Sequence, residues 1–272
     1  MAVASAPAQP RLRPPASYVQ PTPPSVEEGT AILEQSRHIG LSGPYYLEFD
    51  LRILPRRGEE STMAGRWFGN RNVSGPLTRI ELAPGGDRNL VVIVHAGPNP
   101  AAWTGETGDR FKEVSGADLF QDLAGTNLST ADLQTPFMYW TDFVYEGLAR
   151  FRGRPTHVFL LYPPDSGADR YPGIGGARVF IDTAYEAISQ VQWLDDAGNP
   201  VKTITIIDLK KIKDRWIVKS FEVRDEKSRD KTRFVVKAAA LDARLSGELF
   251  IPAGMAEATA FRVPDDIMVR VR

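Results

Sequence analysis

Hydrophobic and polar residues alternate along most of the chain, and turn-forming residues separate the alternating runs. The clearest run is 45–54, where every odd position is apolar or aromatic and Glu48, Asp50 and Arg52 stand between them. Successive side chains of a β-strand point to opposite faces, so this pattern predicts a half-buried strand. Shorter runs of the same kind predict a mainly antiparallel sheet, at 65–69, 77–82, 89–94, 157–162, 177–183, 187–194, 201–207, 215–223 and 231–236.

The same alternation assigns side chains to the two faces of each strand. In the run 187–194 it places Val191 and Trp193 on one face and Ile188 and Leu194 on the other. The following strand also carries apolar residues on both of its faces. The pattern therefore leaves open which face of the sheet is concave.

Two segments do not fit a strand. Ser25 is followed three residues later by Glu28, which is a capping-box pattern and predicts a helix over residues 26–39. Residues 115–133 are less β-like, and 118–123 predicts one or two helical turns. A helix inserted between two strand meanders could cover one mouth of a curved sheet.

The first 24 residues are dominated by proline and alanine. Such a composition cannot bury enough apolar surface to fold, so we expect residues 1–24 to be a disordered tail and 25–272 to be a single domain. Small residues at the very start resemble those around a secretory cleavage site. One hypothesis is that a signal peptide has been removed, and the alternative is the tail of a cytosolic protein.

Composition narrows the class of protein. The 33 basic and 34 acidic residues give a net charge of −1, so no global field favours nucleic acid as a partner. No run of about 18 apolar residues is present, which argues against a membrane-spanning helix. The chain has no cysteine, which excludes disulfides and thiolate metal sites in the sequence as given.

The middle of the chain resembles a known family. Residues 125–133, Gly-Thr-Asn-Leu-Ser-Thr-Ala-Asp-Leu, are similar to a Gly-Ser/Thr-Asp-apolar-Ser/Thr-Tyr-Glu-Asp-Leu element of the LolA-like superfamily of outer-membrane lipoprotein-sorting proteins. Asn127, Thr130 and Ala131 stand where the family more often has Asp, Tyr and Glu. Further weak motifs follow in the family's order, at 137–140, 145–147, 153–155, 157–164, 177–183, 196–202, 214–218, 231–236 and 249–252.

The resemblance covers roughly residues 115–255, and it implies a fold and a class of function. The implied fold is mainly β (α+β), a strongly curved antiparallel sheet forming an unclosed barrel whose concave side is covered by a few helices. Members carry lipoprotein acyl chains across an aqueous compartment, act as their receptors, or sense lipids and envelope stress. The resemblance thus implies a soluble periplasmic protein with lipid or lipoprotein acyl chains as partners, and with envelope membrane proteins as further candidates.

Aromatic and apolar residues on the predicted sheet are the candidates for the wall of a hydrophobic cavity. Aromatic residues are densest around 137–145, and a second pair stands at 67–68. The alternative is that they form the core of a large β domain, which is the commoner role of such side chains. The predicted ligand-binding residues are Trp67, Phe68, Phe137, Trp140, Phe143, Tyr145, Val191 and Trp193.

A search for reacting groups finds no catalytic motif. His38, His95 and His157 lie far apart and form no His-Glu-x-x-His pair, and neither a Gly-x-Ser-x-Gly elbow nor a Gly-Lys-Ser/Thr loop occurs. The run 173–176 is rich in glycine but lacks the strand-to-helix setting of a phosphate site. We therefore expect no enzyme activity, no cofactor and no metal.

Two functions remain open. The first is a soluble carrier of lipid or lipoprotein acyl chains, which predicts a cavity and an apolar ligand. The second is a non-enzymatic envelope sensor or protein-interaction module, which predicts a filled core and an exposed binding surface. The charged run 224–233 fits a solvated hairpin tip or, on the second view, a docking surface.

Overall fold

The computed structural model describes residues 25–38, 43–83, 88–164, 170–252 and 263–272. The predicted tail (1–24), the last predicted helical residue (Ile39) and most of the turn predicted at 83–87 lie outside them. The elements of the first half are α1 (Val26–His38), β1 (Tyr45–Leu54), β2 (Ser61–Asn72), β3 (Gly75–Ala83), β4 (Leu90–His95), β5 (Ala101–Glu106), β6 (Lys112–Glu113), η1 (Gly116–Phe120), α2 (Thr130–Gln134) and η2 (Pro136–Tyr139).

The second half of the chain is almost entirely β. Its elements are β7 (Asp142–Phe151), β8 (Arg154–Tyr162), β9 (Gly176–Asp182), β10 (Ile188–Leu194), β11 (Pro200–Ile212), β12 (Arg215–Asp225), β13 (Lys231–Leu241), η4 (Gly247–Phe250), η5 (Asp265–Ile267) and β14 (Val269–Arg270).

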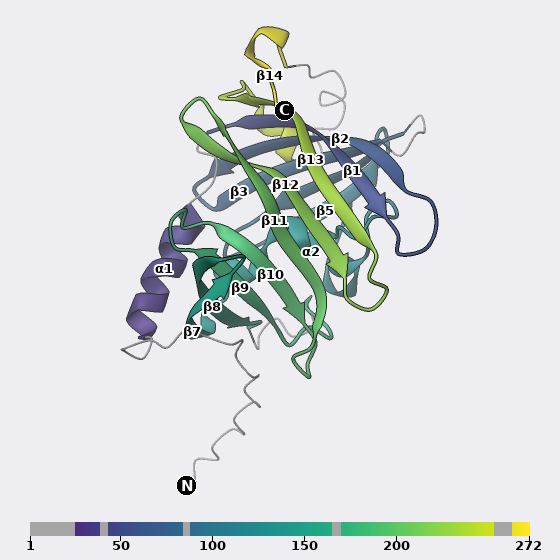
Figure 1. The fold of residues 1–272 in the computed structure, drawn as a ribbon. Helices are drawn as coiled ribbons and strands as arrows, with labels where there is room; N and C mark the ends of the chain where they lie inside the picture. The colour runs from purple at the N-terminus through teal and green to yellow at the C-terminus, as the bar shows by residue number, and fades with distance from the viewer. Residues whose placement is uncertain (1–24, 39–42, 84–87, 165–169, 253–262) are drawn as a thin grey trace, which may run out of the picture.

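Within the described residues, all fourteen strands belong to one antiparallel sheet that does not close. Its order is β6-β5-β4-β3-β2-β1-β13-β12-β11-β10-β9-β8-β7, with β14 paired to β13. Two meanders, β1–β6 and β7–β13, are therefore joined where β1 pairs with β13 along its whole length. Figure 1 shows how strongly the sheet curves, and the predicted unclosed, mainly β architecture is confirmed.

The segment between the two edge strands covers the inner face of the sheet. The chain leaves β6 at one edge, passes through η1, α2 and η2, and enters β7 at the other edge. We call residues 114–141 the covering segment. Every residue of α2 is buried, and the covering segment shares one hydrophobic cluster with β1, β8, β9, β10, β12 and β13. The predicted helical cover is thus present, as two short 3-10 helices and one short α-helix.

Irregularities in the strands accompany the curvature. The register shifts between Glu48 and Phe49 in β1, and again in β7, β10 and β11, and such bulges increase local twist. Glycines face aromatic residues on the inner side of the β1–β2 pair. A Cβ on Gly65 would lie 2.3 Å from the Phe49 ring, and one on Gly69 would lie 2.0 Å from the Tyr45 ring. Only glycine lets these rings lie flat over the neighbouring strand.

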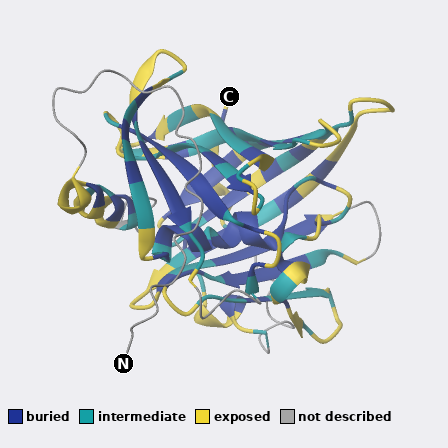
Figure 2. Cartoon of the chain, turned by 90° about the horizontal axis from the view of Figure 1, so that it is seen from below, coloured by how far each residue is buried: buried dark blue, intermediate teal, exposed yellow. Residues whose placement is uncertain are grey.

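Two apolar clusters lie on opposite faces of the sheet. The inner cluster is the main core and includes the fully buried Phe49, Phe159 and Phe234. A smaller cluster on the outer face packs Tyr46 and other residues of the sheet against η4; its buried members are Tyr46, Phe68, Ala240, Ala243, Leu249 and Phe250. Figure 2 shows buried residues concentrated on the strands and exposed residues on the connecting turns.

Helix α1 begins as predicted and packs against the second meander. The backbone N–H of Glu28 donates to the Ser25 side-chain oxygen at 3.0 Å, which is half of the predicted capping box. Leu33 is 1% exposed and joins the inner cluster. The Arg37 side chain donates to the Met138 carbonyl at 2.5 Å, so the helix also contacts the covering segment.

Alternation alone assigned one residue of β10 to the wrong face. The register of β10 against β9 shifts between Ile188 and Gln190, and the shift turns Ile188 to the same inner face as Val191 and Trp193. A bulge breaks the two-residue period, so a run read without it inverts the faces beyond that point. The strand predicted at 201–207 also continues to Ile212, through two further register shifts.

Candidate functional site

Five aromatic side chains meet between the covering segment and the second meander. Trp193 of β10 lies at the centre, with ring centroids 5.3 Å from Phe120, 5.3 Å from Phe137 and 6.2 Å from Trp140. Tyr171, from the β8–β9 connection, contacts Trp140 at 5.2 Å and Phe120 at 6.4 Å. We call Phe120, Phe137, Trp140, Tyr171 and Trp193 the aromatic cluster. All its contacts are edge-to-face, the arrangement that ring quadrupoles favour.

A cavity of about 540 Å³ opens beside this cluster. It lies between the loop that joins β4 to β5, the start of η1, the helix η2 and the connection from β8 to β9. Loops from both meanders therefore meet across the covering segment at this point. The lining residues are Gly97, Pro98, Pro100, Ser115, Gly116, Pro136, Tyr139, Trp140, Pro164, Arg170 and Tyr171.

The wall of the cavity combines proline and aromatic rings with polar groups in nearly equal share, and Arg170 supplies one cation. The Arg170 guanidinium donates to the Pro100 carbonyl, which ties the β8–β9 connection to the β4–β5 loop. Burial raises the pKa of the Tyr171 phenol, and the nearby Arg170 charge and Trp140 indole oppose the rise in part. The Trp140 N–H does not reach hydrogen-bond geometry with any acceptor in the described part of the chain. The nitrogen itself is buried, so the open space of the cavity does not reach it.

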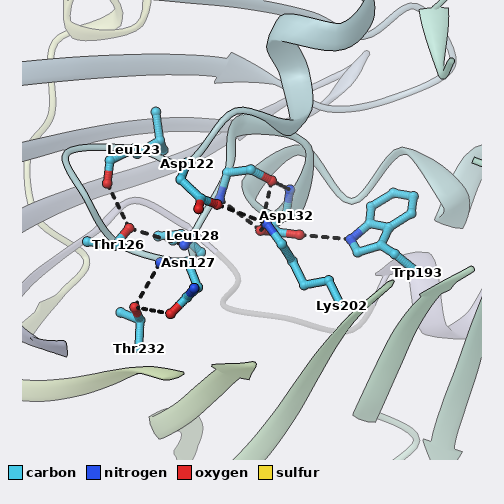
Figure 3. Close-up of polar contacts among 10 residues, drawn as sticks. Asp122, Leu123, Thr126, Asn127, Leu128, Asp132, Trp193, Lys202 and Thr232 are labelled. Carbon is cyan, nitrogen blue, oxygen red and sulfur yellow. Dashed lines mark hydrogen bonds and ion pairs between the residues drawn. The ribbon is translucent and has the colours of Figure 1, made fainter. Parts of the chain in front are cut away.

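A buried carboxylate lies on the other side of the aromatic cluster. Asp132 of α2 accepts from Trp193 Nε1 at 2.8 Å, from Lys202 Nζ at 3.1 Å, and from both the backbone N–H and the hydroxyl of Ser129 at 2.8 Å (Figure 3). Its side chain is 1% exposed and that of Lys202 is 11% exposed. Four donors thus compensate the cost of burying this charge. The ion pair fastens α2 to β11, and the Trp193 hydrogen bond fastens it to β10.

The loop before α2 is fixed by further polar contacts (Figure 3). Asn127 donates its backbone N–H to the Thr232 hydroxyl at 2.8 Å, and that hydroxyl donates to the Asn127 side-chain oxygen at 3.1 Å. Thr126 caps the turn by donating to the Leu123 carbonyl at 2.8 Å. Burial raises the pKa of Asp122, while Lys202, 3.6 Å away, acts in the opposite direction. The covering segment is therefore tied to β13 as well as to β11.

The structure brings three of the predicted ligand-binding residues into one place. Phe137, Trp140 and Trp193 belong to the aromatic cluster, and Val191 lies two residues before Trp193 on the same face of β10. Of the eight predicted residues, Trp140 alone is among the residues that line the 540 Å³ cavity. Phe137, Val191 and Trp193 form the packed layer behind the cavity.

The remaining predicted residues lie elsewhere. Phe143 and Tyr145 are under α1, where Tyr145 stacks on Phe159 at 4.8 Å, and Trp67 packs against Phe234 at 5.7 Å. Phe68 lies on the outer face, in the cluster with η4. Adjacent residues of a strand point to opposite faces, so Trp67 and Phe68 could not line the same cavity.

The histidines with described side chains are held by structural contacts. His95 Nε2 is 2.7 Å from the Phe250 carbonyl, and His157 Nδ1 is 2.7 Å from the Tyr145 hydroxyl. Burial lowers the pKa of His157, which favours its neutral form. Within the described ranges, no group of three or more histidine and carboxylate side chains is arranged to hold a metal ion. No described helix is both long enough and apolar enough to cross a membrane.

Several residues of the site were not predicted from sequence. Arg170 and Tyr171 stand in the Pro/Gly-rich connection at 162–176, where no periodic pattern points inward. Phe120 lies in η1, which is too short to show a face. Asp132 matches the Asp of the family element at 125–133, and this match was the available signal for a buried carboxylate.

Comparisons with known proteins agree on the fold. Residues 107–257, more than half of the chain, match a family model described as "Uncharacterized protein". Among solved structures, the chain is similar to one described as an outer membrane lipoprotein-sorting protein domain from Vibrio parahaemolyticus. That likeness has a TM-score of 0.72 and 18% identity, and it covers 85% of this chain and 99% of the other.

Two further structures resemble the chain at similar coverage. A DUF1329 family protein from Desulfovibrio piger has a TM-score of 0.72 and 16% identity, over 85% of this chain and 98% of that one. A LolA superfamily protein from Nitrosomonas europaea has a TM-score of 0.63 and 13% identity, over 82% and 96% of the two chains. No curated protein sequence matches the chain. At these identities, the likeness establishes the fold and nothing finer.

Proposed function

The chain belongs to the family whose model matches residues 107–257, and it has the LolA-like fold. From this premise we propose that it is a periplasmic carrier of lipid or lipoprotein acyl chains. The ligand is apolar and is held without chemical change, so the protein is not an enzyme and requires no cofactor. The proposed localisation rests on the likeness to the lipoprotein-sorting domain and to the LolA superfamily protein.

The observation that carries this proposal is the cavity beside Trp140. Its volume of about 540 Å³ falls in the range of small-molecule sites, and its wall joins aromatic and proline side chains to the Arg170 cation. An acyl chain in this cavity would contact Trp140, Tyr139 and Tyr171. Its carboxyl or ester oxygen would accept from the Arg170 guanidinium.

Energetics favour such a ligand. Each CH₂ group moved from water into an apolar site gains about 0.8 kcal/mol, so one acyl chain supplies on the order of 10 kcal/mol. A longer ligand would need the aromatic cluster to open, and this requires movement of the covering segment. The Asp132–Lys202 pair opposes that movement, because separating the two groups would leave two charges in an apolar interior.

A second function is favoured by the dense packing behind the cavity. Phe137, Val191 and Trp193 are all less than 5% exposed, so the inner face next to the cavity is filled by the protein's own side chains. A sensor or protein-interaction module would have such a core and would use its outer surface. This function predicts no co-purifying lipid and no saturable binding of an acyl probe.

Titration with a fluorescent fatty-acyl probe tests the carrier function. We expect saturable binding by the native chain. Trp140→Asp should bind the probe at least about tenfold more weakly than the native chain, because a carboxylate among the aromatic rings must be desolvated. Ser115→Trp is a second variant; Ser115 is exposed at the cavity wall, so a large side chain there fills the space without disturbing the core.

Trp216→Ala is the matched control, because Trp216 is exposed and does not line the cavity. It should bind the probe as the native chain does. Absence of saturable binding by the native chain would count against the carrier. So would equal binding by Ser115→Trp and Trp216→Ala, provided that circular dichroism shows both to be folded.

A further inference from the structure

The outer surface carries an exposed aromatic pair that the acyl site does not use. Trp216 of β12 is 48% exposed and Tyr185, between β9 and β10, is 41% exposed. Their rings meet edge to face with centroids 5.6 Å apart. Two large aromatic side chains exposed side by side form a contiguous apolar patch, and such patches mark candidate contact surfaces.

Local contacts hold this pair in place. The Arg154 guanidinium lies over the Tyr185 ring, 4.9 Å from its centroid, and is bonded to Asp182 at 2.5 and 2.9 Å. Asp182 also accepts from the backbone N–H groups of Ala184 and Tyr185, which fixes the turn. The aromatic pair is therefore presented by a rigid turn and a strand, with no need for a conformational change.

Cations surround the pair. Lys211 stands opposite Trp216 in the register of β11 and β12, and the exposed Lys213 lies in the tip of the same hairpin. Residues 206–219 contain five cations and two carboxylates, of which Asp208 is paired with Lys219 at 3.0 Å. Nearby, Asp242 is paired with Arg215 and also feels the Lys213 charge, and Glu186 keeps its negative charge because its partner Gln35 is neutral. With Asp208 and Asp214, four carboxylates stand against the five cations, which leaves a local charge of +1. The local charge is positive although the whole chain is near neutral.

We propose that this surface docks the protein on anionic phospholipid bilayers. Tryptophan and tyrosine favour the headgroup level of a membrane, because one end of each ring system is apolar and the other can hydrogen-bond. Lysines beside them are attracted by anionic headgroups at about 1 kcal/mol each. In this arrangement the Trp–Tyr pair would lie at the headgroup level, and the lysines beside it would contact the anionic headgroups. The proposal rests on different residues from the acyl site and does not depend on it.

Co-sedimentation of the full chain with lipid vesicles tests the proposal. We expect binding to phosphatidylcholine vesicles that contain about one-quarter phosphatidylglycerol, weak binding to pure phosphatidylcholine, and loss of binding as salt rises. The double variant Lys211→Gln, Lys213→Gln should bind about thirtyfold more weakly, which is the effect of losing two such attractions. Trp216→Ser should also weaken binding at low salt, although it leaves the charge of the surface unchanged.

The control variant removes the same charge from the far end of β12. Lys227 and Arg229 are exposed in the β12–β13 turn, and Lys227→Gln, Arg229→Gln should bind vesicles as the native chain does. Trp140→Asp should bind vesicles as the native chain does, although it loses the acyl probe. Failure of the acyl site and failure of the docking surface are therefore distinguishable. Equal losses in the two double variants would overturn the proposal. Failure of the native chain to bind anionic vesicles would overturn it as well. If the native chain then bound an acidic protein and Trp216→Ser did not, the surface would be a protein-binding site instead.

Discussion

Replacing Trp193 with alanine is expected to destabilise the protein by about 4 kcal/mol, the largest effect that we predict for a single substitution. Trp193 is 1% exposed and packs against Phe120, Phe137 and Trp140. Its removal leaves a large cavity among rings that belong to separate elements and cannot collapse together. It also removes the indole donor to Asp132, so a buried carboxylate loses one of its four partners.

Thermal and urea unfolding measure this effect. For a domain of this size, 4 kcal/mol corresponds to a fall in the melting temperature of roughly 8–16 °C. Trp193→Phe keeps most of the ring and should recover more than half of the loss. Trp216→Ala is the matched control and should cost less than about 1 kcal/mol, because Trp216 is half-exposed. If both alanine variants had the same stability, Trp193 would not be the centre of the core.

Replacing Lys202 with methionine is expected to destabilise the protein by about 3 kcal/mol. Lys202 neutralises Asp132 at 3.1 Å in the interior, and removal of one partner from a buried ion pair leaves the other charge uncompensated. Methionine keeps the apolar stem of the side chain, so the loss reports the charge and not the packing. The loosened covering segment should also make residues 126–134 exchange their amide protons faster.

A surface ion pair provides the comparison for Lys202. Lys219 and Asp208 are 3.0 Å apart, but the Asp208 side chain is 48% exposed, and Lys219→Met should cost no more than about 1 kcal/mol. Urea unfolding of both variants gives the difference directly. A Lys202→Met protein as stable as Lys219→Met would contradict the role of the ion pair in fastening the covering segment.

Alternation predicted the strands well because most of them have one buried face. β1 runs over the residues that its pattern indicated, from Tyr45 to Leu54. The pattern failed at a bulge, where Ile188 joined the face assigned to Val191. The prediction that Trp67 and Phe68 belong to one site rested on the density of aromatic residues and disregarded alternation, which places the two on opposite faces.

The site was harder to predict than the sheet because it is built by connections. Tyr171 and Arg170 come from a Pro/Gly-rich connection that has no period, and the loop around Pro98 and Pro100 lies far from them in sequence. α2 is buried on every side, so it shows no polar face that would mark it as a helix. The pairing of Asp132 with Lys202 joins residues seventy positions apart, which a single sequence does not reveal.

Native mass spectrometry of the purified protein, followed by solvent extraction and lipid analysis, tests the acyl-carrier function most directly. We expect a mass higher than that of the chain by one acyl lipid or acylated peptide, and loss of this species in Ser115→Trp but not in Trp216→Ala. A native chain that is consistently free of lipid, and that takes up none when incubated with phospholipid, would contradict the carrier function and favour a protein-interaction module.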